Sequence, residues 1–207
     1  MGITERRIRQ KEEVRSAILE SAWALVKEEG WQSLSIRKIA DAIEYSVPVI
    51  YSHFENKDAI LTEFNRDGFQ LLSEALEAAK SAHEDPCNQL EAIAQAYWDF
   101  AFDNREYYQL MYGLGMPTCE TVAKIPELQQ FAHIVQSTLA AIIADSKHPD
   151  AEPFLKYHTF WSILHGLISI NMMDNGGNMI QSTPKYHDCG PMVLKDAVAG
   201  FIKALKY

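Results

Sequence analysis

Residues 33–64 read SLSIRKIADAIEYSVPVIYSHFENKDAILTEF, and this stretch decides the fold that we expect for the chain. Two short segments with helical spacing of apolar residues stand on either side of a tight break, and a third segment follows a charged turn. Two short packed helices that aim an outer face at a partner form the arrangement of a helix-turn-helix DNA reader. We therefore predict that this stretch binds DNA.

Helical spacing predicts which side chains of the stretch are buried. Ile36, Ile39, Ala40 and Ile43 follow the i, i+3, i+4, i+7 pattern of one helix face. Ser33 or Ser35 is predicted to cap this helix, Ser46 to cap the next one and Asn56 the one after it. At about 100° per residue, the inward side chains of the middle helix are Val47, Ile50 and Phe54. The outward side chains are Pro48, Val49, Ser52 and His53, with Tyr51 on the flank.

The outward set has the chemistry of base and phosphate contacts. An exposed Val49 suits thymine methyl groups, and Ser52 and His53 can hydrogen-bond bases or phosphates. Lys57, at the start of the following helix, suits a phosphate. The alternative from spacing alone is a plain three-helix bundle without a DNA role.

The stretch resembles the DNA-binding domain of tetracycline-repressor (TetR) family transcriptional regulators over about residues 10–65. The matching elements are Leu34-Ser35-Ile36-Arg37-Lys38-Ile39-Ala40, Ser46, Ile50-Tyr51-xx-Phe54 and Asn56-Lys57-Asp58-xx-Leu61, preceded by Ala17-Ile18-Leu19-xx-Ala22 and Glu29-Gly30-Trp31.

The resemblance implies roles for individual residues. Tyr51, Lys57 and Arg37 match positions near the phosphate backbone. Ser46 opens the recognition helix, and the base-facing positions are Val47, Pro48, Val49, Ser52 and His53. This chain departs from the family at Glu44, where Gly is common in the turn. Because Gly relieves a strained backbone angle, Glu44 either accepts that strain or alters the turn.

Charge is distributed unevenly along the 207 residues, whose net charge is −9. Residues 1–66 carry 10 Lys and Arg against 11 Asp and Glu, so that 9 basic and 17 acidic residues follow them. Arg6, Arg7, Arg9 and Lys11 lie close together near the start of the chain. A DNA reader needs positive charge where phosphates sit rather than over the whole protein. The overall acidity therefore does not exclude a nucleic-acid partner.

Helical spacing dominates the rest of the chain as well. We predict an all-α fold of about nine helices: 5–29 ended by Gly30, the three of the stretch above with the last running from 57 towards 82, then 88–103, 105–113, 126–145, 151–173 and 190–206. A turn is predicted at Asp174–Asn178 and a long loop at Gly177–Pro191. Residues 1–56 form the predicted DNA-binding domain and residues 57–207 an effector-binding and dimerisation domain, with the helix from 57 as the connection.

The second part is rich in aromatic residues and Met. Most of these side chains belong to a core, but apolar pockets between helices also hold small ligands. The candidate effector-binding residues are Trp98, Phe102, Tyr108, Met111, Tyr112, Trp161, His165 and Met172. The segment Trp161-Ser162-Ile163-Leu164-His165-Gly166 resembles the Trp…His-Gly signature in the C-terminal domain of one TetR subgroup. That resemblance places the helix 151–173 in both the pocket and the dimer interface.

Other classes of function find less support. A nucleophile elbow, a P-loop and a full dinucleotide fingerprint are all missing from the sequence. His187-Asp188-Cys189 and His83…Cys87 lack a fuller set of zinc ligands. Three widely spaced cysteines argue against a disulfide framework. We expect no cofactor, no metal, no membrane span and a cytoplasmic protein.

The predicted function is a homodimeric repressor that binds a palindromic operator in double-stranded DNA. A small hydrophobic or aromatic effector is expected to release it, with the dimer formed through the last two helices. An activator is the first alternative. An all-helical enzyme, or an interaction module without DNA binding, is the second.

Overall fold

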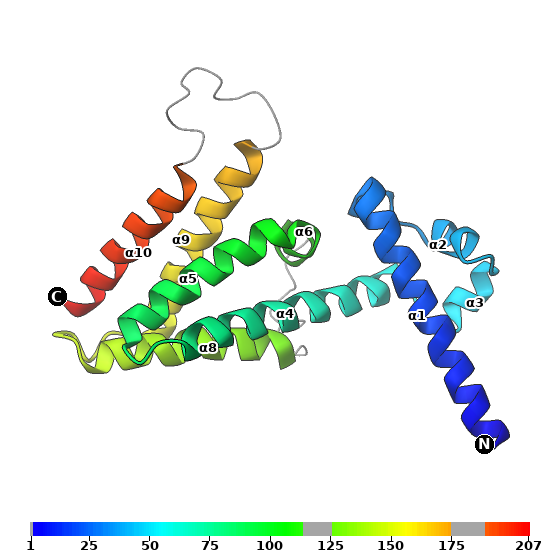
Figure 1. The fold of residues 1–207 in the computed structure, drawn as a ribbon, viewed down its shortest axis with the longest axis horizontal. Helices are drawn as coiled ribbons and strands as arrows, with labels where there is room; N and C mark the ends of the chain where they lie inside the picture. Colours follow the sequence, from blue (N-terminus) through cyan, green and yellow to red (C-terminus); the bar gives the residue numbers. More distant parts are fainter. Residues whose placement is uncertain (1, 114–125, 175–188) are drawn as a thin grey trace. The chain divides into compact units, whose positions relative to one another are not determined.

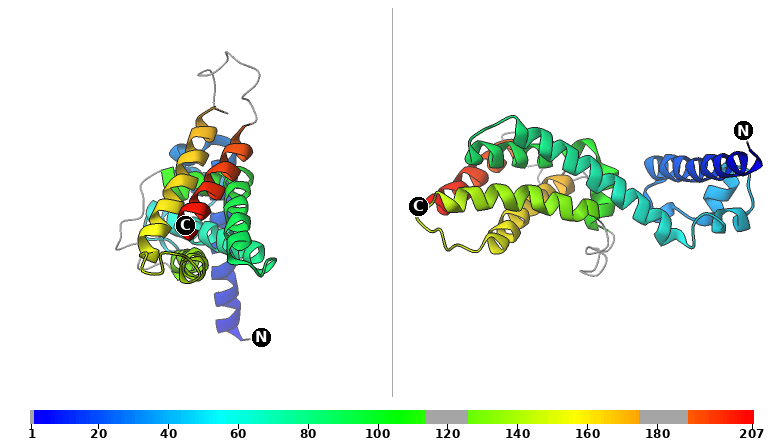
Figure 2. Two further views of the ribbon diagram at one scale, coloured as in Figure 1. Left: turned by 90° about the vertical axis from the view of Figure 1, so that its left-hand side faces the viewer. Right: turned by 90° about the horizontal axis from the view of Figure 1, so that it is seen from below.

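The computed structural model describes residues 2–113, 126–174 and 189–207, and all of its regular structure there is helical (Figures 1 and 2). The described residues form nine α-helices, as predicted. They are α1 (Ile3–Glu29), α2 (Ile36–Ala42), α3 (Val47–Tyr51), α4 (Lys57–Ser81), α5 (Pro86–Asp103), α6 (Arg105–Gly113), α8 (Pro126–Ala144), α9 (Pro153–Asp174) and α10 (Gly190–Lys206). A 3-10 turn, η1 (Trp31–Ser33), follows α1.

Short-range signals in the sequence set most of the helix ends. Gly30 ends α1 with φ 81°, a backbone angle that favours glycine. Ser35 caps α2 by accepting a hydrogen bond from the Lys38 N–H, at 3.2 Å. The Asn56 side chain likewise accepts from the Ala59 N–H, at 2.8 Å, near the start of α4. Ser46 occupies the N-cap position of α3, but its side chain makes no capping hydrogen bond, so the capping predicted for it was wrong.

The chain divides into two compact units, and each has its own core. The first comprises the chain up to Asp67 and the segment that begins at Glu106 in α6. The second begins at Gly68 within α4 and contains α5, α8, α9 and α10. The long helix α4 is therefore shared by both units.

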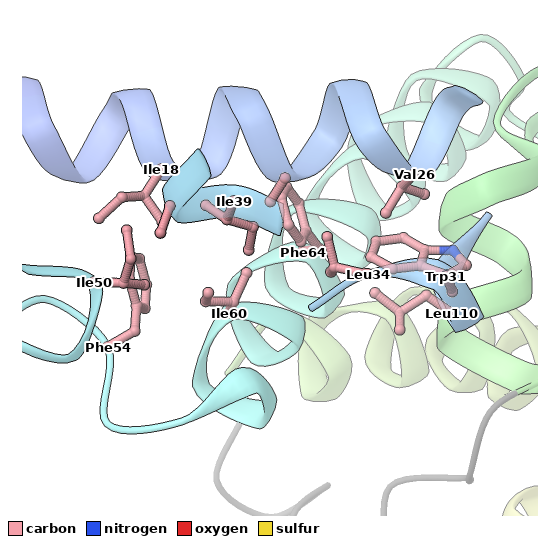
Figure 3. Close-up of a cluster of buried hydrophobic side chains, with 12 residues drawn as sticks. Ile18, Val26, Trp31, Leu34, Ile39, Ile50, Phe54, Ile60, Phe64 and Leu110 are labelled. Carbon is pink, nitrogen blue, oxygen red and sulfur yellow. The ribbon is translucent and has the colours of Figure 1, made fainter. Parts of the chain in front are cut away.

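The core of the first unit lies under α1 (Figure 3). Ile18 of α1 meets Ile39, Ile50 and Phe54 from the helix-turn-helix segment, and all four side chains are buried. At the other end, Leu110 of α6 joins the same cluster. The Trp31 Nε1–H donates to the Glu106 carbonyl at 2.7 Å. Stacking of Trp23 on Tyr107, with ring centroids 4.3 Å apart, also attaches α6 to this unit.

The second unit is a bundle in which α5, α8, α9 and α10 pack against one another. Phe131 of α8 meets Tyr97 of α5, and Phe160 of α9 meets Phe201 of α10. Figure 1 shows α9 and α10 running side by side. The last part of α4 is tied to α8 by the Lys80 ammonium, which donates to Ser137 Oγ at 2.9 Å.

Part of the predicted loop structure lies outside the described residues. The turn and loop predicted between Asp174 and Pro191 fall largely within 175–188. Where the description resumes, α10 already begins at Gly190. No helix among the described residues has the length and apolar character needed to cross a membrane.

Candidate nucleic-acid interface

The turn between α2 and α3 closes with the hydrogen bonds of a Schellman motif. The Tyr45 N–H donates to the Ala40 carbonyl at 3.0 Å, and the Glu44 N–H donates to the Asp41 carbonyl at 3.3 Å. These are the two bonds that satisfy free carbonyls at a helix end when the next residue is left-handed. The turn therefore forms the two hydrogen bonds of this motif although it lacks glycine.

Glu44 itself takes the left-handed position, with φ 58°. Among the described residues it alone has a positive φ without being glycine. This conformation costs an L-residue with a Cβ roughly 1–2 kcal/mol. Of the two outcomes that the sequence left open, Glu44 accepts the strain and the turn is not altered.

The inward side of α3 agrees with the prediction from spacing. Ile50 and Phe54 are buried, and Val47 is half-buried against the same core. Ser46, Pro48, Tyr51 and Ser52 are exposed, and Tyr51 shows 52% of its surface. Val49, which spacing placed on the exposed outward side, is half-buried, so its predicted full exposure was wrong. The exposed residues of α3 and its two flanks are called the reading face below.

Ser52 and His53, which directly follow α3, differ in hydrogen bonding and in burial. The Ser52 hydroxyl donates to the Val49 carbonyl at 2.7 Å, so it faces a partner only as an acceptor unless that bond breaks. His53 follows the helix and is half-buried, with Nδ1 enclosed and lacking a hydrogen-bond partner within the described structure. Burial, and then the Lys11 and Arg15 charges of α1, lower the pKa of His53, while Glu12 opposes them.

The orientation predicted for His53 was therefore wrong in part. Spacing placed the imidazole with the outward set, but the ring lies beside α1 at the edge of the reading face. The helix ends at Tyr51, so the assumption of 100° per residue no longer holds at position 53. A DNA contact by His53 stays a prediction.

The basic residues around the reading face are not equivalent. Arg37 is exposed in the first turn of α2, whereas Lys38 forms an ion pair with Glu29 and so lowers the pKa of that carboxyl group. Lys57 is half-buried at the first position of α4, next to the Asn56 cap. Arg37, Tyr51 and Lys57 can present a cation or a hydroxyl to phosphate oxygens, while α3 presents small side chains.

The eight candidate effector residues do not gather in one unit. Tyr108, Met111 and Tyr112 belong to the first unit, where Met111 is fully buried. The other five lie in the second unit. There Trp98 packs against Phe102 with ring centroids 4.8 Å apart, and Trp161 stacks on His165 at 5.3 Å. The half-buried Met172 accepts a hydrogen bond from Arg105 at its carbonyl, at 3.4 Å.

The second unit also contains an open groove that the sequence did not predict. It measures about 430 Å³ and lies between α5 and α10. The lining residues are Glu91, Ala94, Gln95, Pro191, Met192, Leu194, Lys195 and Val198. Trp98 lies nearby under Gly190, where an added Cβ would come within 2.8 Å of the indole ring. Spacing within one helix carries no signal for such a groove, because two helices distant in sequence form it.

Two family models match the sequence. The one described as "Bacterial regulatory proteins, tetR family" matches residues 18–64, and the one described as "Tetracyclin repressor-like, C-terminal domain" matches residues 90–185. None of the curated proteins matches the chain.

Solved structures share this fold over nearly the whole chain. A protein of unknown function from Rhodococcus sp. RHA1 is 23% identical, with 93% of this chain and 95% of that chain covered and a TM-score of 0.72. The TetR family transcriptional regulator PfmR from Thermus thermophilus is 21% identical, with coverage of 92% and 99% and a TM-score of 0.63. The fatty acid degradation regulator FadR from Bacillus halodurans is 15% identical, with coverage of 92% and 93% and a TM-score of 0.64.

At these identities the solved structures show the fold alone. The two family models match the sequence itself, one over the helix-turn-helix segment and the other over most of the C-terminal part. The exposed reading face and the Schellman turn form a helix-turn-helix, which is the kind of domain that the N-terminal match describes, and the C-terminal match names the same family. The chain therefore belongs to the TetR family of DNA-binding transcriptional regulators, which are not enzymes.

Proposed function

We propose that the protein is a repressor that binds a palindromic operator as a homodimer and leaves it when a small hydrophobic or aromatic effector binds. Residues 1–56 would hold the DNA, and residues 57–207 would bind the effector and form the dimer. The observation that carries this proposal is the reading face. Its helix has Ile50 fully buried and Tyr51 half-exposed, so one side anchors the helix and the other is free for the major groove.

We assign different roles to the reading face and to the basic residues around it. Arg37, Tyr51 and Lys57 would bind phosphates and set the position of the head on the duplex. Pro48 and Ser52, which are exposed, would face base edges, with Val47, Val49 and His53 at the margins because all three are half-buried. Ser46 opens the helix on its exposed side.

The dimer is proposed to form through α9 and α10. The apolar side chains of α9 are not confined to the side that packs in the bundle, which is typical of a helix with more than one partner. Yet Leu155 and Ile170 of α9, and Met192 and Val193 of α10, are exposed in the single chain. Gly166 and Gly200 leave open space where a Cβ would stand, so another helix can approach closely there. A second copy would cover this surface.

The effector is proposed to be apolar and to bind in the second unit. The candidate residues there supply aromatic rings, a thioether and an imidazole: Trp98, Phe102, Trp161, His165 and Met172. Trp161 and His165 belong to the stretch that resembles the Trp…His-Gly subgroup. Tyr108, Met111 and Tyr112 belong to the first unit and are not part of this proposed site. One similar structure is named a fatty acid degradation regulator, so linear acyl chains belong in a screen beside aromatic compounds.

The decisive experiment is selection of duplexes by the purified protein from a random-sequence pool, followed by sequencing. The proposal expects an enriched inverted repeat whose binding weakens steeply with salt. A folded protein that enriches no sequence would overturn the proposal. A reporter gene with the selected site then separates repression from activation, because the repressor should lower expression until an effector is added.

A further inference from the structure

The first three turns of α1 carry a surface that the proposed DNA contacts do not use. Residues 4–13 are exposed without exception, and Val14 is the first α1 residue that packs against the core. Ile8 is 59% exposed although it is apolar. In Figure 1 the N-terminal end of α1 continues beyond α3. This segment, residues 4–13, is called the arm.

Charges on the arm are sorted by face. Arg7, Lys11 and Arg15 follow at i, i+4 and i+8, so they share one side of the helix. Ile18 and Ala22 continue that side, and both are buried against the helix-turn-helix segment. The acidic residues Glu5, Glu12 and Glu13 fall about 100° or more away from Lys11. One side of α1 is thus buried in the core around Ile18 and Ala22 and basic in the N-terminal turns that extend beyond the core.

The inner end of this basic side touches Phe54, which follows α3 in the chain. The Arg15 guanidinium lies 4.3 Å from the centre of the Phe54 ring and pairs with Glu63 at 3.1 Å. Lys11 lies within electrostatic range of His53. The Arg15 side chain is therefore held by contacts within the protein. Arg7 and Lys11 have neither an ion pair nor a hydrogen bond within the described structure.

We propose that the arm binds DNA, with Arg7 and Lys11 contacting phosphates beyond those held by Arg37, Tyr51 and Lys57. Two considerations favour DNA over another partner. The basic side lies close to the segment that follows α3, because Arg15 contacts the buried Phe54 and Lys11 lies within electrostatic range of His53 at the edge of the reading face. Arg7 and Lys11 lie on the same side of α1 as its buried residues, which pack against the helix-turn-helix segment. Beside a helix that reads DNA, the expected anions are the phosphates of the DNA backbone. The inference rests on the proposed operator binding and extends its footprint.

The test compares two double variants of the full-length protein on the duplex that it selects. R7Q/K11Q removes two charges from the basic side. The matched control, R6Q/R9Q, removes two charges from the other sides of the same turns, where Arg9 pairs with Glu13 at 3.6 Å. Both variants change only exposed residues, so their melting temperatures should equal that of the wild type.

Each lost phosphate contact reduces the slope of log K against log salt by about 0.9. In the proposed dimer R7Q/K11Q removes two contacts from each subunit, four in all, so it should reduce the slope by about 3.6 and weaken binding at low salt by at least about tenfold. R6Q/R9Q should change the slope far less. Shortening the duplex from its ends should weaken the wild type before it weakens R7Q/K11Q, because only the wild type reaches the outer phosphates.

Failure of the arm and failure of the operator proposal give different results. If the wild type selects no duplex, the operator proposal fails. If the wild type selects a duplex but R7Q/K11Q retains the wild-type slope, the arm does not touch DNA. Equal losses in R7Q/K11Q and R6Q/R9Q would also overturn the inference, because they indicate a general charge effect and not a contact by one face.

Discussion

The two units of this chain use helices in opposite ways. The first unit has short helices, α2 and α3, that each bury one side and expose the other, so position in the sequence indicates orientation. The second unit has long helices, and in α9 the apolar residues are not gathered on one side. Apolar residues then do not tell which side meets the core, which meets a ligand and which meets a second copy. Binding residues are therefore easier to predict in a unit whose helices are strongly two-sided.

In α3 a buried residue, Ile50, stands directly beside an exposed one, Tyr51. Ile50→Ala should have the largest effect of the variants considered. Ile50 is fully buried, so the substitution leaves a cavity and should destabilise the first unit by about 2–5 kcal/mol in chemical denaturation. Tyr51→Ala, on the next residue and half-exposed, should stay within about 0.5 kcal/mol of the wild type. It should nevertheless weaken binding to the selected duplex. Equal destabilisation by both variants would contradict the two-sided helix.

The exposed apolar surface of the second unit is tested by Ile170→Glu. If α9 meets a second copy, a carboxylate at this 58% exposed position would be buried without a partner. The dimer dissociation constant in sedimentation should rise by at least about tenfold. Leu71→Glu is the matched control, because Leu71 is an exposed aliphatic residue on α4 in the same unit. A dimer weakened equally by both, or by neither, would reject α9 as the interface.

The strained turn of the first unit is tested by comparing Glu44→Gly with Glu44→Gln. Glycine adopts φ 58° without the Cβ penalty, so Glu44→Gly should raise the free energy of unfolding by about 1 kcal/mol. Glu44→Gln removes the charge and keeps the strain, so its stability should match the wild type. Both should strengthen DNA binding if the carboxylate lies near phosphates. A destabilised Glu44→Gly variant would show that the turn is not strained.

The smallest effect concerns pH, and it involves one histidine in each unit. Burial is the main cause that lowers the pKa of His53 and the cause that lowers the pKa of His165. The unfolded chain therefore binds protons more readily than the folded one, so stability should fall as pH drops through the ordinary histidine value near 6.5. His53→Gln and His165→Gln should each reduce this loss when unfolding is followed between about pH 7 and about pH 5. An unchanged pH dependence in both variants would disprove the role of these two imidazoles.

Much of this architecture was predictable because its causes lie within a few residues. Gly30, Ser35 and Asn56 act on backbone groups no more than four positions away, and the helix bounds agree with them. Ile50 and Phe54 follow the period of a single helix, so their burial was predicted correctly. The Ser46 cap failed although the residue type was favourable, because the side chain does not make the bond.

Other features depend on contacts between distant segments, which periodicity cannot reveal. Met111 and Tyr108 have a pattern typical of an apolar pocket, yet α6 belongs to the first unit through Trp31, Trp23 and Leu110. The groove between α5 and α10 joins side chains about a hundred positions apart in the chain.

The reading face shows where local information ends. Residues 33–64 were enough to predict two short helices, their buried sides and a family resemblance, because capping, turn chemistry and helical period are local interactions. The left-handed backbone of Glu44 and the half-buried ring of His53 depend on how α2, α3 and α1 pack. Packing selects among conformations that a short segment can adopt at similar energy, and for this reason those two details appeared only in the folded chain.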